Sequence, residues 1–232
     1  MKLLKVILTD DRFIDFLPRV ILSVKELITP KIFIVVDILI MTDDKQIKII
    51  EYCKNNKLSY EVYKNDLLKT EKKSFFDTKR LNASGWTVKK MSKVMNIRNA
   101  YLDYASNNDY NYLLQIDGDV LPEKNGLSDL YNTGKKYVGA SVSKTLGGKN
   151  FYYVIPDKVS EGKLYECFVI GNCFHLEHSD LFSFKYELPN CDETEENLYK
   201  LDPDSFQRCL EYRKFGGKIY CNPLVKCNHL EL

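Results

Sequence analysis

The sequence has no hydrophobic run long enough to cross a membrane. The longest apolar run, 32–41, is interrupted by Asp37 and has about half of the ~20 residues that a membrane-spanning helix needs. The apolar run 3–8 is too short for a secretory signal, and acidic residues follow it at once. The sequence therefore predicts neither a signal peptide nor a transmembrane helix.

A strong charge of one sign is also missing. The 232 residues include 34 Lys and Arg against 32 Asp and Glu, so the net charge is only +2. Proteins that bind nucleic acid usually carry a clear excess of basic residues, and nothing in this balance demands such a partner. With 44% hydrophobic and 28% charged residues, the composition is that of a globular domain rather than a disordered chain.

Cysteine pairs with the spacing of metal ligands are absent. The seven cysteines are odd in number, and none of them forms a C-x-x-C pair, which argues against a zinc ribbon. We interpret all seven as reduced thiols, and we expect a cytoplasmic protein.

Strands and helices alternate along the chain. Short apolar runs rich in β-branched residues predict strands, and apolar residues at every third or fourth position predict helices. The expected strands are 3–9, 32–40, 59–63, 110–116, 137–142, 151–155 and 218–221, and the expected helices are 15–28, 44–55, 90–106 and 205–215. This alternation predicts one α/β domain with a mainly parallel sheet between helices. Ligands of such sheets bind beyond the carboxyl ends of the strands, at or near which Thr9, Asp10 and Asp37 are expected.

The expected strand 110–116 leads directly into the acidic turn Asp117-Gly118-Asp119. Two carboxylates that lie so close repel each other, so either one is protonated or a cation lies beside them. Gly118 lets the backbone turn sharply and approach a ligand. Oxygen ligands favour Mg²⁺ or Mn²⁺, and such an ion can stabilise a departing diphosphate. The alternative is an acidic surface turn without a ligand.

The order of these motifs resembles the GT-A glycosyltransferases. Ile97-Arg98-Asn99-Ala100, on an expected helix, precedes the apolar strand and the D-x-D turn as in that family. The resemblance is closest to family 2 transferases and to Golgi mannosyltransferases of the Anp1 type. It implies a Rossmann-like GT-A domain with a mostly parallel central sheet, flanking helices and a smaller antiparallel portion on the acceptor side. It also implies that Arg98 faces the nucleotide diphosphate and that Asp117 and Asp119 bind Mn²⁺ or Mg²⁺.

Further motifs extend the resemblance on the donor side. Ile34-Val35-Val36-Asp37 resembles the second strand of the family, whose Asp contacts the nucleoside. Asp43 and Asp44 lie where the family often has a Ser-Thr-Asp turn, which extra residues displace here. Thr9 and Asp10, by their position at a strand end, and Gly118, by its close approach to a ligand, are expected in the same nucleotide-sugar site.

The second half of the chain carries three more motifs of the family. Val169-Ile170-Gly171-Asn172-Cys173 resembles its glycine loop, which assigns Gly171 and Asn172 to the donor sugar. Asp202-Pro203-Asp204-Ser205 resembles its acidic pair before a helix, and implies that Asp204 takes the proton of the acceptor hydroxyl. Asp202, Glu195 and Glu196 are substitutes for that role. The alternative is that Asp202 and Asp204 only cap the helix and favour its dipole. Cys227-Asn228-His229 resembles the family's terminal motif, whose histidine completes the metal site.

The resemblance covers nearly the whole chain and implies one domain, 1–232. Residues 1–120 would bind the nucleotide-sugar, a UDP- or GDP-sugar, and residues 121–232 a glycan, lipid or protein acceptor. The implied activity is that of a metal-dependent glycosyltransferase of the hexosyltransferase class.

Two other functions remain open from the sequence. A haloacid-dehalogenase-like phosphatase also has an apolar strand before D-x-D-x-V, which 117–120 fits. In that family the motif follows the first strand, whereas several expected strands precede it here. A nucleotide- or sugar-binding module without catalysis could have the same fold.

Overall fold

The structure is a computed structural model that describes residues 1–64, 88–144, 150–151, 163–168, 170, 173–187 and 205–230. The strands in these ranges are β1 (Lys2–Leu8), β2 (Val35–Asp43), β3 (Tyr60–Tyr63), β4 (Tyr112–Asp117), β5 (Val120–Pro122), β6 (Tyr137–Lys144), β7 (Asn150–Phe151), β8 (Tyr165–Cys167), β9 (Phe174–His178) and β10 (Ile219–His229). The helices are α1 (Leu17–Glu26), α2 (Ile47–Asn55), α3 (Val88–Asn107), α4 (Gly126–Asn132) and α6 (Phe206–Lys214), with the 3-10 turns η1 (Asp11–Phe13) and η2 (Ser179–Leu181).

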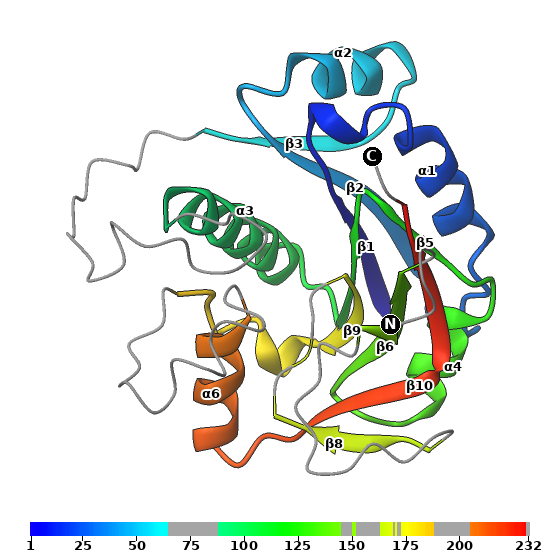
Figure 1. Ribbon diagram of the computed structural model, residues 1–232, viewed down its shortest axis with the longest axis vertical. Helices are drawn as coiled ribbons and strands as arrows, with labels where there is room; N and C mark the ends of the chain where they lie inside the picture. Colours follow the sequence, from blue (N-terminus) through cyan, green and yellow to red (C-terminus); the bar gives the residue numbers. More distant parts are fainter. Residues whose placement is uncertain are drawn as a thin grey trace.

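The strands form one mixed sheet in the order β3-β2-β1-β4-β9-β6-β10-β5, with β7 beside β6 and β8 beside β10 (Figure 1). The first four strands of this order are parallel to one another, and β9 then pairs antiparallel with both β4 and β6. The prediction of one α/β domain with a parallel central part and an antiparallel part is confirmed. The described part of the chain contains no helix that is long and apolar enough to span a membrane.

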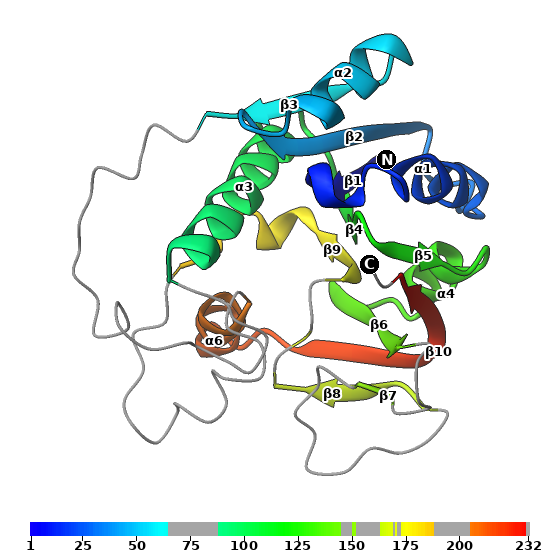
Figure 2. The same cartoon turned by 45° about the horizontal axis from the view of Figure 1, so that its top comes forward.

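Helices cover both faces of the sheet. Figures 1 and 2 show α3 and α6 on one side and α1 and α4 on the other. The reason lies in the strand period, because alternate residues of β1 point to opposite faces. Leu3 and Ile7 pack into the core under α1, α2 and α4, whereas Leu4 and Val6 pack into the core under α3 and α6. Helix α1 contributes Leu17, Val20, Ile21 and Val24, the spacing of a helix with one buried face.

Several elements differ from the sequence prediction. Strand β2 begins three residues later than expected and continues to Asp43. Strand β10 has 11 residues, whereas only a short strand, 218–221, was expected there. Strand β10 continues past Cys221 through a shift of register against β6 between Asn222 and Lys226, a bulge that includes Pro223. Strands β5 and β9 and helix α4 were not expected. The expected strand 151–155 lies outside the described residues except for Phe151.

Candidate functional site

The carboxyl ends of β1 and β4 meet at the point where the strand order of the sheet reverses. Leu8 of β1 is in register with Asp117 of β4, so Thr9 and Gly118 lie side by side. The amide of Gly118 donates a hydrogen bond of 2.7 Å to the carbonyl of Leu8. A Cβ atom on Gly118 would lie only 2.6 Å from Cβ of Thr9, so the turn requires glycine. In α/β sheets such a reversal point is the usual position of a ligand.

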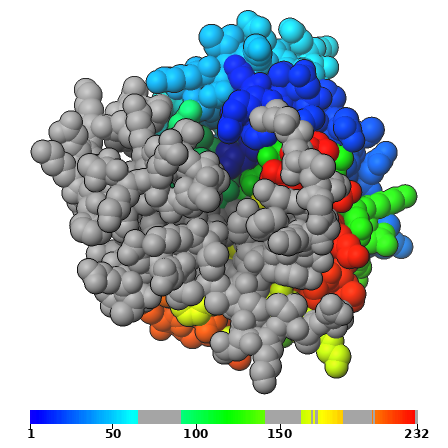
Figure 3. Space-filling view, in the orientation of Figure 1, coloured from blue at the N-terminus to red at the C-terminus, as the bar shows by residue number. Residues whose placement is uncertain are grey.

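The end of β10 returns to this acidic turn. His229 is in register with Val120, and the amide of Leu230 donates a 2.6 Å hydrogen bond to the carbonyl of Asp119. Asp119 is only 9% exposed, and its Oδ2 lies 3.3 Å from Nε2 of His229. In Figure 3 red atoms of the C-terminal strand reach the surface beside blue atoms of the N-terminal segment. The structure thus brings the D-x-D turn and the C-terminal histidine of the predicted site together.

Burial changes the chemistry of Asp119. The pKa of its carboxyl is raised from 3.8 to about 6; removal from water is the largest cause and the nearby Asp10 contributes, while a backbone hydrogen bond and Arg12 oppose the rise. Asp10 itself is held by Arg12, whose Nη2 lies 2.6 Å from Oδ2 of Asp10. Arg12 was not singled out in the sequence. Its position directly after the acids at a strand end is the signal that could have identified it.

The raised pKa of Asp119 predicts a pH dependence of stability. Between about pH 4 and about pH 6 the carboxyl of Asp119 is still largely protonated in the folded protein but has lost its proton in the unfolded chain. The free energy of unfolding should therefore fall as pH rises from about 4 to about 6. A difference of about two pKa units corresponds to about 3 kcal/mol. Urea unfolding of the metal-free protein at several pH values should show this fall, and Asp119→Asn should lack it. Parallel curves for the two proteins would show that the carboxyl titrates normally.

The side chain of Asp117 is turned toward the buried side chains of Gln115 and Arg98 and not toward His229. Its Oδ1 accepts a hydrogen bond of 3.2 Å from Nε2 of Gln115 and lies 3.7 Å from Nη2 of Arg98. Arg98 is 3% exposed and lies over the ring of Tyr186, with 5.5 Å from its guanidinium carbon to the ring centre. The next residue, Asn99, exchanges two hydrogen bonds of 2.8 and 2.7 Å with the backbone of Tyr186. The Arg-Asn pair therefore connects α3 to the acidic turn and to the segment after β9.

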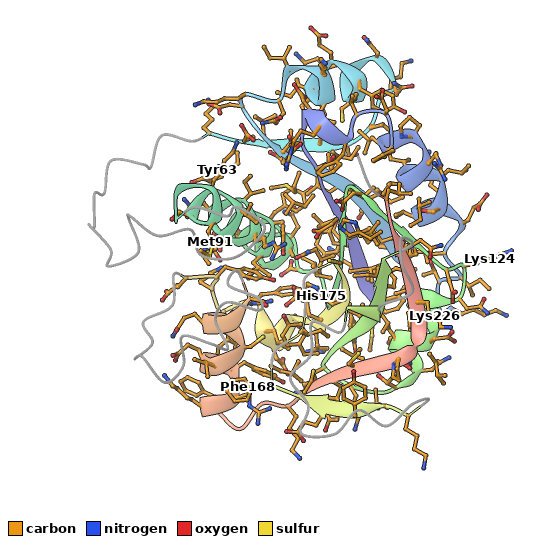
Figure 4. All side chains as sticks on the ribbon, in the orientation of Figure 1. Tyr63, Met91, Lys124, Phe168, His175 and Lys226 are labelled. Carbon is orange, nitrogen blue, oxygen red and sulfur yellow. The ribbon has the colours of Figure 1, made fainter. Side chains whose placement is uncertain are left out.

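A buried ion pair lies deeper on the same face of the sheet. Arg208 of α6 donates to Oε2 of Glu177 on β9, and both side chains are completely buried. Burial would raise the pKa of Glu177, but Arg208 holds it below its ordinary value. His175, which lies in the interior in Figure 4, has its pKa lowered by burial and is neutral at neutral pH. Arg208 and Glu177 were not predicted as part of any site, and His175 was expected as a structural or acceptor-side residue.

The expectation that Asp37 lies at the carboxyl end of its strand is wrong. Asp37 pairs with Leu4 in the first half of β2, far from the strand end, and accepts a 2.6 Å hydrogen bond from the hydroxyl of Tyr110. The acid at the carboxyl end of β2 is Asp43, which is buried and paired with Lys93 at 2.7 Å. Burial would raise the pKa of Asp43, but its hydrogen bonds, first that of Lys93, hold it below 3.8. The error follows from the later start and end of β2.

Other predicted site residues lie outside the described part of the chain. They are Gly171, Asn172, Asp202 and Asp204, with the substitutes Glu195 and Glu196. Two described residues adjoin these segments in the sequence: Ile170 precedes Gly171, and Ser205 follows Asp204. The hydroxyl of Ser205 donates a 2.9 Å hydrogen bond to the carbonyl of Ile170.

The fit of a metal ion rests on two side chains. Among the described residues, no three His, Cys, Asp or Glu side chains converge on one point. Asp119 and His229 do face each other, and a carboxylate oxygen with a neutral imidazole nitrogen is a donor set that Mn²⁺ accepts. The hydroxyl of Thr9 is buried beside Gly118 and finds no hydrogen-bond partner among the described residues. The donor set fits a divalent ion that takes its remaining ligands from a substrate or water.

Comparison with known proteins shows the fold. No protein-family model matches the sequence, and no curated protein does. Among solved structures, S. aureus TarS is similar over 100% of this chain and 37% of its own, with a TM-score of 0.55 and 15% identity. GalNAc-T7 with UDP, GalNAc and Mn²⁺ is similar over 100% of this chain and 44% of its own, with a TM-score of 0.61 and 14% identity. Residues 1–349 of TarS in complex with UDP-GlcNAc give a TM-score of 0.55 at 12% identity, and this chain spans 60% of that one. The chain thus has the GT-A fold of these structures, and it spans less than two thirds of the length of each of them.

Proposed function

We propose that this protein is a metal-dependent glycosyltransferase that moves a sugar from a UDP- or GDP-sugar to a hydroxyl group of a glycan, lipid or protein. The observation that carries the proposal is the acidic turn at the strand-order reversal, with Asp119 buried against His229. Burial of an acid is costly unless a cation or hydrogen bonds compensate it, and a buried acid with a raised pKa at a ligand-binding edge is a candidate ligand of a bound cation. The GT-A fold and the Mn²⁺ and UDP in one structural neighbour support the same function.

In this proposal Asp119 and His229 would hold Mn²⁺ or Mg²⁺, with Asp117 as the adjacent acid. When bound, the ion supplies positive charge to the leaving diphosphate. The guanidinium of Arg12 is 67% exposed beside Asp10 and can approach the same phosphates. Thr9, Asp10 and the backbone at Gly118 line the nucleotide side. Arg98, first expected to face the diphosphate, is buried against Asp117 and acts by holding that carboxylate.

The acceptor side of the proposal rests on the sequence motifs. Asp204, or Asp202 in its place, would accept the proton of the attacking hydroxyl, and Gly171 and Asn172 would lie under the donor sugar. Residues 1–120 would form the donor half and residues 121–232 the acceptor half. His229 then belongs to the acceptor half by sequence and to the donor site by position.

A screen of nucleotide-sugars tests the function. One UDP- or GDP-sugar should be slowly hydrolysed in the presence of Mn²⁺, with release of the nucleoside diphosphate, and excess chelator should stop the reaction. The same donor with Mn²⁺ should raise the free energy of unfolding by ~2.7 kcal/mol at 100 times its dissociation constant. Full activity in excess chelator would contradict metal dependence. Hydrolysis of a simple phosphomonoester, without any use of nucleotide-sugars, would favour the phosphatase alternative.

A further inference from the structure

A row of buried polar side chains leads from Asp117 to helix α6. Nε2 of Gln115 donates to Oδ1 of Asp117 at 3.2 Å, and the hydroxyl of Tyr101 donates to Oε1 of Gln115. The hydroxyl oxygens of Tyr101 and Tyr186 lie 3.4 Å apart, and Nη1 of Arg208 donates to that of Tyr186 at 3.0 Å. The row thus crosses from α3 and β4 to α6.

Asp117 and Tyr101 hold the amide of Gln115 from its two ends. A glutamine amide has one donor end and one acceptor end, and only the donor end is attractive to a carboxylate. The carboxylate of Asp117 therefore takes the NH₂ group, and the hydroxyl of Tyr101 donates to Oε1 and fixes the other end of the amide. The reversed amide would place Oε1 against the carboxylate and the NH₂ group against the hydroxyl. Both Tyr101 and Gln115 are fully buried, so water cannot take over either role.

Arg208 fixes the far end of the row. Besides Tyr186 and Glu177 it donates to the carbonyls of Phe184 at 2.8 Å and Leu181 at 3.1 Å. An arginine with this many fixed acceptors holds its guanidinium plane in one orientation. Helix α6 begins at Phe206, directly after the segment that carries the proposed base, so the row joins the two proposed halves of the site.

We infer that Tyr101 is a positioning residue for the metal-binding edge: through Gln115 it holds the Asp117 carboxylate in place, and through Tyr186 and Arg208 it couples that carboxylate to helix α6. The inference rests on the proposed function, because it assigns Asp117 to the neighbourhood of a bound divalent ion. It adds Tyr101, Gln115 and Tyr186, which neither touch the ion nor carry the chemistry.

Tyr101→Phe tests the inference against Tyr137→Phe as a matched control. Both tyrosines are fully buried, but the hydroxyl of Tyr137 has no hydrogen-bond partner among the described residues, although its ring lies 5.5 Å from the guanidinium of Arg208. Mn²⁺ affinity, measured by titration calorimetry, should fall about tenfold in Tyr101→Phe, the effect of roughly one hydrogen bond. In Tyr137→Phe it should stay within about twofold of the parent. A purely structural role would lower stability without changing the affinity of the folded protein.

A second background tests whether Tyr101 acts through Gln115. In Gln115→Met the amide is absent, so adding Tyr101→Phe should cause no further loss of Mn²⁺ affinity. Tyr186→Phe tests the connection to α6 and should lower the affinity by a smaller factor, since Arg208 keeps its other acceptors. This variant also keeps the test decisive if Tyr101→Phe fails to fold.

The outcomes separate the inference from the proposed function. If the parent protein binds no Mn²⁺, the proposed function and the inference both fall. If the parent binds Mn²⁺ and both Tyr101→Phe and Tyr186→Phe bind it equally well, the inference alone falls. Equal losses in Tyr101→Phe and Tyr137→Phe would also overturn it, because the hydrogen bond to Gln115 would then not matter.

Discussion

Asp119→Ala is expected to lower Mn²⁺-dependent sugar transfer by about 100-fold or more while the protein stays folded. Asp119 provides the carboxylate that faces His229, so its loss removes one of the two side chains proposed to hold the ion. Because burial raises the pKa of this carboxyl to about 6, its removal also relieves an unfavourable buried charge at neutral pH. The measurement is turnover against Mn²⁺ concentration with the donor found in the screen, together with urea unfolding.

Asp103→Ala is the matched control for that variant. It removes an exposed acid of α3 that pairs with Lys185 at 2.5 Å, so the change in net charge is the same. Turnover should be unaffected by it. Asp117→Ala should also lose turnover, but it should in addition destabilise the protein because it leaves the buried Arg98 without this carboxylate. Normal turnover in Asp119→Ala would remove the basis of the proposed function.

Arg208→Ala is expected to cost ~3–5 kcal/mol of unfolding free energy. The substitution leaves Glu177 buried and charged without its partner, and it removes the hydrogen bonds to Phe184, Leu181 and Tyr186. A buried carboxylate that loses its cation must either be protonated or bring water into the core. Urea unfolding at neutral pH measures the effect.

Arg213→Ala supplies the comparison on the same helix. Arg213 is 31% exposed and lies 3.4 Å from Glu166, so its loss should cost about 1 kcal/mol or less. The double variant Glu177→Leu with Arg208→Met should recover much of the stability lost in Arg208→Ala, because it removes both charges together. An equal cost for Arg208→Ala and Arg213→Ala would mean that the Glu177 pair contributes no more than a surface contact.

The elements that the sequence predicted well have local causes. Strands β1 and β4 are apolar runs that end in acids, and the glycine between Asp117 and Asp119 marks the sharp turn. Helices α1, α2, α3 and α6 follow from apolar spacing and from the residues that end them. The carboxyl-end position of Thr9, Asp10 and Asp117 follows directly from these strands.

The rest depends on partners that are distant in the sequence. Strand β9 reads as a polar segment because it contains His175 and Glu177, and the cation that compensates the buried Glu177 is Arg208, 31 residues further on. The bounds of β2 were misjudged because the residues before it, among them Ile32 and Ile34, are apolar yet exposed. Nothing local in the sequence distinguishes such residues from a buried strand start, so Asp37 was preferred to Asp43.

The return of β10 to the acidic turn means that the two halves cannot be exchanged as independent modules. His229 is 110 residues from Asp119 along the chain, yet β5 and β10 pair directly beside the turn. A chimera that took its second half from a relative with another acceptor would import that relative's histidine and the strand that aims it. Under the proposed function, acceptor preference and metal affinity would therefore be inherited together, and engineering one without the other would require grafting inside residues 121–232 rather than at their boundary.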